Sequence, residues 1–206
     1  MIFNILALIS VIFIVVILKR IAGILPYIVA CLSRWKENIN IYTSLKLRRD
    51  RDIVAIAMII PFCLLATNFR LIDMEFMSDF TTDARLGITA GILTGYLLLR
   101  QSVIAAMRFT KISSTTYYAA TSTEHTYFIV LSILLLATGG FLSVIGVNLN
   151  AVRIAMFCLS GAIYAAFLFQ KLQIFSSSCS FFMSFLYLCA LEILPTGVLI
   201  ASAVIF

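Results

Sequence analysis

Hydrophobic residues occur along this chain in long runs that few charged residues interrupt. A helix needs about 20 apolar residues to cross the hydrocarbon core of a bilayer, with a range of roughly 17–25. Runs of this length predict an all-α fold, a polytopic bundle of about six membrane-spanning helices. The expected spans are 2–18, 53–69, 86–107, 126–147, 151–169 and 181–204.

The segment 21–32 is apolar but too short to be a span of its own. Its twelve residues would rise about 18 Å as a helix, against a hydrocarbon thickness of about 30 Å, and they include Pro26. Three alternatives stay open: the segment spans the membrane, continues the first helix after a kink, or lies at the membrane interface.

The segment 33–52 is polar and basic, and its apolar residues recur at helical spacing. Trp35, Ile39, Tyr42 and Leu45 are separated by four, three and three residues. This pattern predicts an amphipathic helix on the membrane surface, near residues 35–47, with Trp35 at the level of the lipid headgroups. The basic residues expected at that surface are Lys36, Lys46, Arg48, Arg49 and Arg51.

Composition supports a membrane protein and excludes two other classes. Hydrophobic residues make up 63% of the 206 residues and charged residues only 12%, against about a quarter in soluble domains. A soluble globule of this size could not bury so much apolar surface. Disordered chains have the opposite composition. We therefore expect a single integral membrane domain over residues 1–206, with the five cysteines acting as small apolar fillers.

The net charge of +6 predicts an orientation in the membrane. Basic residues accumulate in cytoplasmic loops, and eight of them lie between the first two expected spans. The first, third and fifth connections are then cytoplasmic, and both termini lie outside. This distribution explains the charge without nucleic acid as a partner. The expected partners are the lipid bilayer and either other membrane proteins or a second copy of the chain.

Glu192 is the most unusual residue, because it is a carboxylate near the middle of the last expected span. An ionised carboxylate at that depth costs about 3 kcal/mol on insertion scales, so it should face protein or water and have a partner. Pro195 lacks the N–H that would bond the carbonyl of Leu191, so we expect a kink and a free acceptor there. A spacing of four places one partly polar face on this span: Ser184, Leu188, Glu192 and Thr196.

Arg100 is the first candidate partner for Glu192, because it lies inside the third expected span. Tyr96 lies four residues earlier on the same face and is a candidate member of the same polar site. The alternative is that Arg100 extends to the cytoplasmic headgroups. A paired Glu192 has two interpretations: a proton, ion or substrate site, or a structural carboxyl that locks the bundle.

Three glycines predict a close helix contact in the third span. Gly87, Gly91 and Gly95 are spaced by four, a pattern that lets another helix approach closely. Gly91 is nine residues from Arg100 and therefore on the opposite face of the helix. The third span should then touch one neighbour through its glycines and another through Arg100.

The familiar motifs of enzymes and metal sites are missing. There is no HExxH, Walker loop, nucleophile elbow or dinucleotide-binding glycine motif, and the single histidine, His125, is expected at a membrane interface. The acidic residues of 70–85 lack the spacing of a calcium loop and predict a solvated loop. We expect no cofactor, no metal and no enzymatic activity.

Three stretches resemble a known family. They are Pro61-Phe-Cys-Leu-Leu-Ala-Thr-Asn-Phe-Arg70, Tyr96-Leu-Leu-Leu-Arg100 and the more specific Leu186-Tyr-Leu-Cys-Ala-Leu-Glu-Ile-Leu-Pro-Thr196. Together they resemble the bacterial membrane family named domain of unknown function 4271, over about residue 48 to the C-terminus. The resemblance implies a bacterial cytoplasmic (inner) membrane protein and implies no chemistry.

Two function classes follow from these features. The first is an assembly or scaffold subunit, in which the buried pair and the glycine face hold helices together. The alternative is a small transporter or channel with Glu192 on its path. Transport would be favoured by more intramembrane charges, or by an inverted repeat with broken helices in matching positions, and the sequence shows no such repeat.

Overall fold

The structure is a computed structural model that describes residues 2–71, 80–106, 114–177 and 180–197. Every element in these ranges is helical. The elements are α1 (Ile2–Ser33), α2 (Trp35–Thr43), α3 (Leu45–Ala57), α4 (Ile59–Asn68), α5 (Thr82–Ala106), α6 (Ser114–Ile145), α7 (Leu149–Ser176), α8 (Phe181–Leu188) and the π-helix η2 (Cys189–Ile193).

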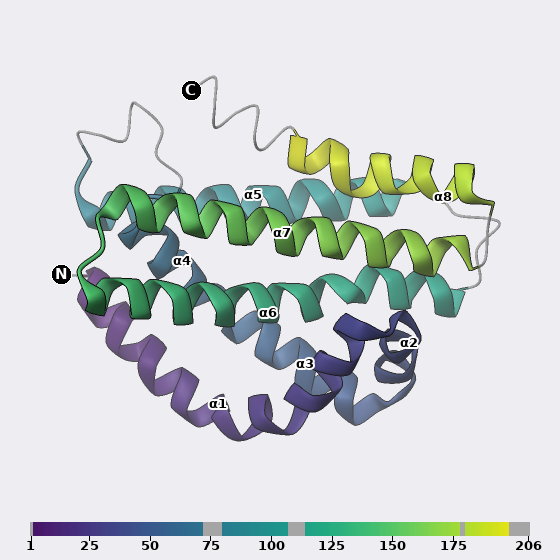
Figure 1. The fold of residues 1–206 in the computed structure, drawn as a ribbon, viewed down its shortest axis with the longest axis horizontal. Helices are drawn as coiled ribbons and strands as arrows, with labels where there is room; N and C mark the ends of the chain where they lie inside the picture. Colours follow the sequence, from purple (N-terminus) through teal and green to yellow (C-terminus); the bar gives the residue numbers. More distant parts are fainter. Residues whose placement is uncertain (1, 72–79, 107–113, 178–179, 198–206) are drawn as a thin grey trace.

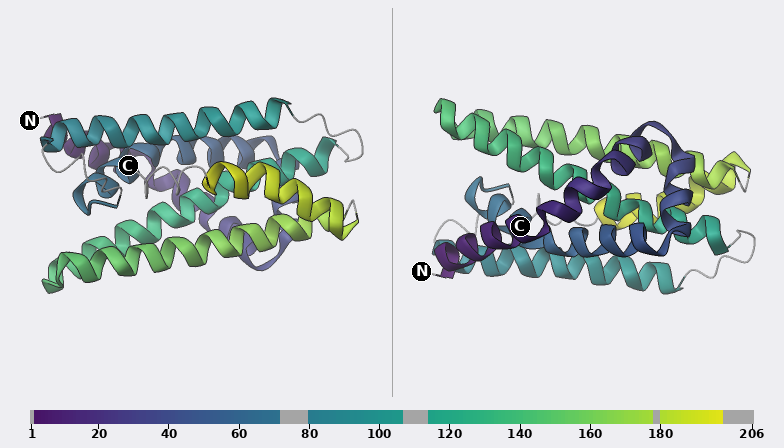
Figure 2. Two further views of the ribbon diagram at one scale, coloured as in Figure 1. Left: turned by 90° about the horizontal axis from the view of Figure 1, so that it is seen from above. Right: turned by 90° about the horizontal axis from the view of Figure 1, so that it is seen from below.

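The long helices run roughly along one axis and alternate in direction (Figure 1). The starts of α1 and α5 and the end of α6 lie at one end of the bundle, and α2 lies at the other. The most extensive packing is between α6 and α7, while α1 crosses obliquely and packs on α3 (Figure 2). The turn between α6 and α7 contains Gly146, whose φ of 74° suits glycine, and Asn148, whose side chain accepts from the backbone of Asn150.

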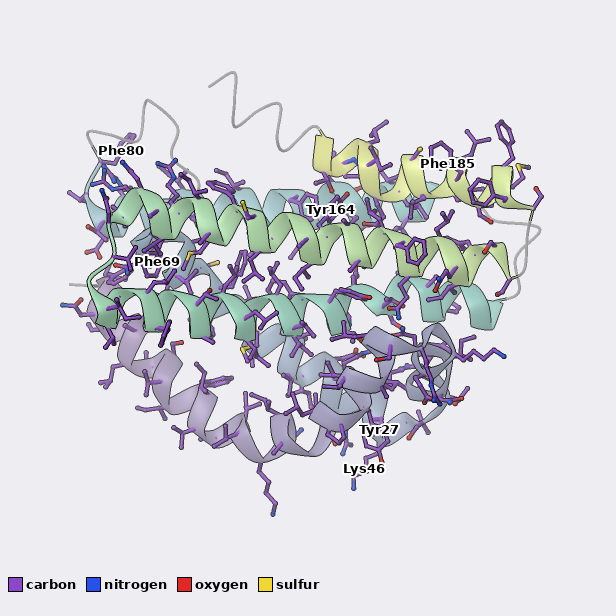
Figure 3. All side chains as sticks on the ribbon, viewed as in Figure 1. Tyr27, Lys46, Phe69, Phe80, Tyr164 and Phe185 are labelled. Atoms are coloured by element: carbon purple, nitrogen blue, oxygen red, sulfur yellow. The ribbon has the colours of Figure 1, made fainter. Side chains whose placement is uncertain are left out.

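Among the described residues, four helices are long and apolar enough to cross a membrane: 2–33, 82–104, 120–145 and 149–176. Large apolar side chains cover the outside of the bundle, as Figure 3 shows, and Val16 and Phe182 are 72% and 70% exposed. A surface of this kind is unfavourable in water and suits lipid. The coarse prediction of an all-helical membrane protein is therefore confirmed.

The first helix is longer than the sequence predicted. It does not end before Lys19 but continues through Pro26 to Ser33, which is one of the three alternatives left open. Ile24 and Ile28 are buried in a core with residues of α3 and α6, so packing stabilises the second half of this helix. The charged side chain of Lys19 does not end the helix, because it is exposed at the surface of the protein.

The second expected span, 53–69, is divided between the end of α3 and all of α4, with a break at Met58. Pro61 lies in the first turn of α4 and has no N–H to donate to the carbonyl of Ala57. The break therefore falls where proline removes the hydrogen bond. Parts of two other expected spans, Met107 and 198–204, lie outside the described residues, as do Asp73, Glu75 and Asp79 of the acidic loop.

The segment 33–52 forms two helices that meet at Ser44, and it is more buried than predicted. Asn38 and Ile41 are 0% and 3% exposed, in a helix that packs on α6 and α7, whereas Leu45 is 79% exposed. The expected apolar face, which ended at Leu45, is therefore not the buried one. The side chain of Trp35, at the other end of that face, is not among the described side chains. Helical spacing indicated an amphipathic helix but could not reveal which face meets the bundle.

The basic residues of this segment divide into two groups. Lys36, Lys46 and Arg49 are exposed, and the guanidinium of Arg48 lies 5.2 Å from the ring centre of Tyr42. Arg51 contradicts the prediction of a surface position, because its side chain is only 1% exposed. It is buried because Asp52 and Ser122 provide partners inside the bundle.

The predicted close contact at Gly91 is not found among the described residues. A Cβ added to Gly87, Gly91 or Gly95 would meet nothing within 4 Å. The tight glycine is instead Gly139 on α6. A Cβ there would lie 2.6 Å from the methyl carbon of Met156 and 3.0 Å from the ring of Phe69. The regular spacing of the three glycines therefore did not identify the close contact, which depends on how α4, α6 and α7 pack together.

Gly139→Val should therefore destabilise the protein, by about 1–3 kcal/mol as for other overpacked sites. Its matched control is Gly140→Val, since a Cβ on the adjacent Gly140 meets nothing within 4 Å. The change in helix propensity from glycine to valine is the same at both positions, so the difference in stability between the two variants reports packing alone. Thermal unfolding in detergent should show a lower Tm for Gly139→Val; equal Tm values would contradict the close contact.

Candidate functional site

Glu124 and His125 lie well inside α6, whereas the expected fourth span began only after them, at residue 126. Helix α6 begins at Ser114, ten residues earlier, although the segment is rich in serine and threonine. Thr123 and Thr126 are both 0% exposed, so tertiary packing overrides their weak helix propensity. The extra turns carry Glu124 and His125 into the bundle.

Lys171 is likewise internal. The fifth span was expected to stop before it, but α7 continues to Ser176 and Lys171 is 1% exposed. Its ammonium group points at Glu192, and its neighbour Gln170 is buried with it. The expected span 151–169 ended before Lys171, so this residue was not predicted to belong to the site. The sequence did contain a signal that the helix continues past Lys171: the polar pair Gln170 and Lys171 is followed by a further apolar turn.

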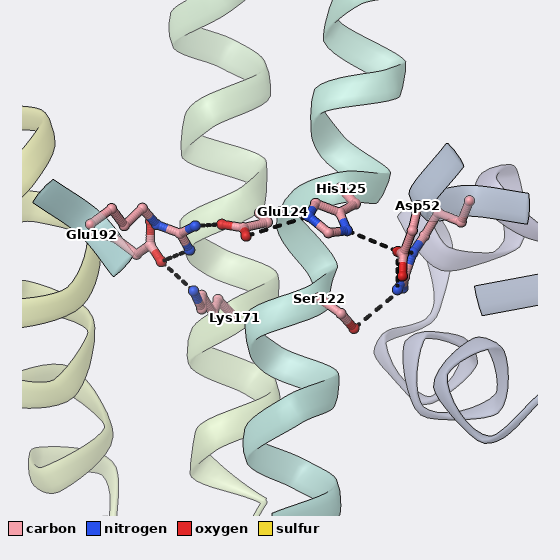
Figure 4. A network of polar contacts seen from close by, with 8 residues as sticks. Asp52, Ser122, Glu124, His125, Lys171 and Glu192 are labelled. Atoms are coloured by element: carbon pink, nitrogen blue, oxygen red, sulfur yellow. Dashed lines mark hydrogen bonds and ion pairs between the residues drawn. The ribbon is translucent and has the colours of Figure 1, made fainter. Parts of the chain in front are cut away.

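The centre of the site is Glu192, which is held by two cations. Arg100 Nη2 on α5 donates to Glu192 Oε1 at 2.7 Å, so the predicted contact is present. Lys171 Nζ on α7 donates to the same oxygen. Arg100 also reaches α6, where its Nη1 forms an ion pair with Glu124 (Figure 4). One guanidinium thus joins three elements.

The network continues from Glu124 to the polar end of α3. His125 Nε2 lies 3.7 Å from Glu124 Oε1, and His125 Nδ1 lies 2.9 Å from Asp52 Oδ1. Arg51 binds Asp52 through Nε at 3.1 Å and Nη2 at 2.9 Å. Its Nη1 donates to Ser122 Oγ at 3.3 Å. Cations and carboxylates therefore alternate on both sides of His125, whose ring lies between Glu124 and Asp52.

Asp52 and His125 have more exposed side chains than Glu192, although Arg51 beside Asp52 is buried. The exposed fraction is 35% at Asp52 and 39% at His125, 19% at Glu124, and 2% at Glu192. Pairing is essential at the buried end, where an isolated charge would be strongly destabilising. At the other end, burial raises the pKa of Asp52. Hydrogen bonds from His125 and Arg51 and the charge of Arg51 outweigh it, so this pKa lies below its usual value.

Glu192 lies in a π-helical turn, Cys189–Ile193, in which the N–H of Leu194 donates to the carbonyl of Cys189. Such turns often occur at functional sites. The expected free carbonyl was that of Leu191, but the hydroxyl of Tyr164 donates to the carbonyl of Glu192, at 3.3 Å. The local distortion at Pro195 is thus a π-turn that presents Glu192 to its partners.

Tyr96 and Thr196 are adjacent, as members of one polar site should be. Their hydroxyl oxygens are 3.3 Å apart, which links α5 to the segment after η2. Ser184, Leu188 and Glu192 are all buried, in agreement with the predicted face. Tyr96 contacts Thr196, whereas the carboxylate ligands of Arg100 come from Glu124 and Glu192.

A cavity of about 380 Å³, here called the network cavity, lies against this cluster. Its lining comes from α3, α4, α5, α6, α7 and η2. Most of the wall is aliphatic or aromatic, and the polar groups are few. They include Tyr96, Arg100, Glu124, His125, Tyr164 and Glu192. Mainly apolar walls with a few convergent polar groups are typical of small-molecule sites.

Comparisons with protein-family models, with curated proteins and with solved structures found no match. Within the described ranges, no group of three or more His, Cys, Asp or Glu side chains is placed to hold a metal ion. The arrangement can exchange protons at its carboxylates and imidazole and can bind a small molecule in the cavity.

Removing Glu192 should cost more than removing either of its partners. Glu192→Leu leaves both Arg100 and Lys171 without the carboxylate that they share, and breaking a buried pair costs about 3–5 kcal/mol. Glu192→Gln keeps an acceptor and should cost less. Arg100→Leu combined with Glu192→Leu should recover part of the loss, because the two residues interact directly.

The matched control is the ion pair of Arg20 and Asp50, at 3.4 Å with side chains 47% and 18% exposed. Arg20→Leu should change stability by about 0–1 kcal/mol, as for other surface pairs. Thermal unfolding of the single and double variants measures the coupling. Strictly additive effects at Arg100 and Glu192 would exclude a direct interaction.

Asp52 should make stability depend on pH in the acid range. Its folded pKa lies below the ordinary value of about 4, so it stabilises the fold above its unfolded pKa. That contribution disappears as pH falls through the folded pKa. Asp52→Asn should lower the Tm at neutral pH and flatten its decline in acid. Parallel curves for parent and variant would be the contrary result.

Proposed function

We propose that this protein is a small membrane transporter whose solute site is the network cavity. The observation that carries the proposal is that a buried charged network borders a cavity. Four charged or titratable lining residues are Arg100, Glu124, His125 and Glu192. A purely structural clamp needs no open space beside it, and a carrier does.

The network suits a site that changes state on protonation. Arg100 holds α5 to α6 through Glu124 and to η2 through Glu192. A proton on Glu124 removes one of these attractions and frees the guanidinium from α6. Glu192 lies in the π-turn η2 of the last helix, and π-turns often occur at functional sites.

The proposal includes a topology. We propose six passes, formed by α1, by the end of α3 with α4, by α5, by α6, by α7, and by α8 with η2; these helices alternate in direction (Figure 1). The basic segment 33–52 then faces the cytoplasm and both termini lie outside. We place the chain in a bacterial inner membrane, as the resemblance to the 4271 family implies, and propose no enzymatic step.

A second candidate function is the assembly or scaffold role. It is favoured by the stripe of Gly87, Gly91 and Gly95, which is open to a neighbour outside the chain. In that case the network is a clamp, and the protein acts by holding partner helices.

Cysteine accessibility separates the two functions. In a variant without its native cysteines, Ser160→Cys places a thiol on the cavity wall. Phe157→Cys, on the same helix and 51% exposed, is the control at an outer position away from the cavity lining. The reagent is a membrane-impermeant methanethiosulfonate, applied to either side of oriented vesicles.

For a transporter, Ser160→Cys should react from both sides, because the cavity opens alternately to each. The Phe157→Cys control should be unreactive, since lipid excludes the charged reagent. Labelling of Ser160→Cys from neither side would overturn the transport proposal and favour the scaffold role. Labelling from one side only would show a binding site without passage and would overturn it as well.

A further inference from the structure

We propose that the network cavity takes an uncharged, mainly apolar molecule with an aromatic ring system and one hydroxyl group. The inference rests on the proposed transport function and names the class of its solute. Three independent features of the cavity support it: the charge balance of its network, the character of its walls, and two neighbouring acceptors that do not bond to each other.

The charge balance leaves no partner for an ion. The network contains three cations, Arg51, Arg100 and Lys171, and three carboxylates, Asp52, Glu124 and Glu192. Each cation is in contact with a carboxylate. An ionic ligand would have to break one of these pairs or stay unpaired in a medium of low dielectric constant. A neutral ligand avoids both costs.

The walls select an apolar body with rings. Five aromatic side chains line the cavity, from α5, α6 and α7, and aliphatic side chains make up most of the remainder. Its volume of about 380 Å³ falls within the range of roughly 300–1,000 Å³ typical of small-molecule pockets. Offset or edge-on ring contacts add to apolar burial. The aromatic residues are Tyr96, Tyr127, Phe128, Tyr164 and Phe167.

The polar wall presents two neighbouring hydrogen-bond acceptors that do not bond to each other. His125 Nδ1 lies 2.9 Å from Asp52 Oδ1, which assigns the proton to Nδ1 and leaves Nε2 an acceptor in the neutral ring. Nε2 faces another acceptor, Glu124 Oε1, at 3.7 Å, which is too long for a hydrogen bond. A ligand O–H directed at them can donate to either acceptor. Both residues line the cavity.

The test uses four probes that share one apolar body. They are pyrene, 1-pyrenemethanol, 1-pyrenecarboxylate and 1-pyrenemethylammonium, added to the protein in lipid nanodiscs. Binding is followed as energy transfer to pyrene from Trp35, the chain's single tryptophan. Ser160→Phe fills the cavity wall, and the matched control is Ala162→Phe, on the exposed side of the same helix. The difference between these variants removes the contribution of probe dissolved in lipid.

The alcohol should bind saturably to the parent and to Ala162→Phe but not to Ser160→Phe. Both ions should bind at least about tenfold more weakly, since a tenfold change corresponds to only about 1.4 kcal/mol. Pyrene itself should bind more weakly than the alcohol, and His125→Leu should remove that advantage. Because Ser160→Phe leaves the network intact, the test does not depend on the stability of His125→Leu.

Three outcomes would overturn the inference. They are tighter binding of either ion than of the alcohol, equal binding to the two phenylalanine variants, and no saturable binding at all. None of them affects the cysteine labelling, which needs no ligand. If Ser160→Cys is labelled from both sides but the alcohol does not bind, only the proposed solute class is wrong. If the alcohol binds but Ser160→Cys is labelled from neither side, the transport proposal is wrong.

Discussion

A charge buried in a low-dielectric interior must have a partner, and much of this bundle is arranged to satisfy that requirement at Glu192. The carboxylate is 2% exposed, and Arg100 and Lys171 donate to the same oxygen. These three residues come from η2, α5 and α7, so their pairing holds together segments that are far apart in the sequence. Loss of the carboxylate would leave Lys171 without a carboxylate partner and Arg100 with Glu124 alone, and an unpaired buried charge is strongly destabilising.

Because Arg100 also binds Glu124, the same requirement extends to α6 and, through His125 and Asp52, to α3. Asp52 and His125 are partly exposed, whereas the three cations and Glu192 are buried. A network that combines buried pairs with a titratable, accessible end can transmit a change in protonation to the packing of helices. In the proposed function, the adjoining cavity is the place where such a change acts on a bound solute.

The π-turn at Glu192 shows how local backbone chemistry contributes to the site. Pro195 removes a hydrogen-bond donor. The helix before it forms a π-turn over Cys189–Ile193, in which the hydrogen bond spans five residues instead of four. Glu192 thereby keeps its buried position while its own carbonyl accepts from Tyr164. Pro61 has a different effect, since the chain breaks at Met58 and continues as a separate helix. The same residue type thus gives a π-turn in one place and a helix break in the other.

The sequence alone determined the helical membrane class, because run length and composition report directly on what a bilayer can accommodate. It also indicated Glu192 and its contact with Arg100, since a carboxylate at that depth requires a cation and few are available in the apolar runs. Only the tertiary structure decided that Lys171, Glu124, His125 and Arg51 join them, that Gly139 is the tight glycine, and that Gly91 is open. These outcomes depend on which helix faces meet, and facing is set by packing between residues distant in sequence, which hydrophobic runs and residue spacing do not encode.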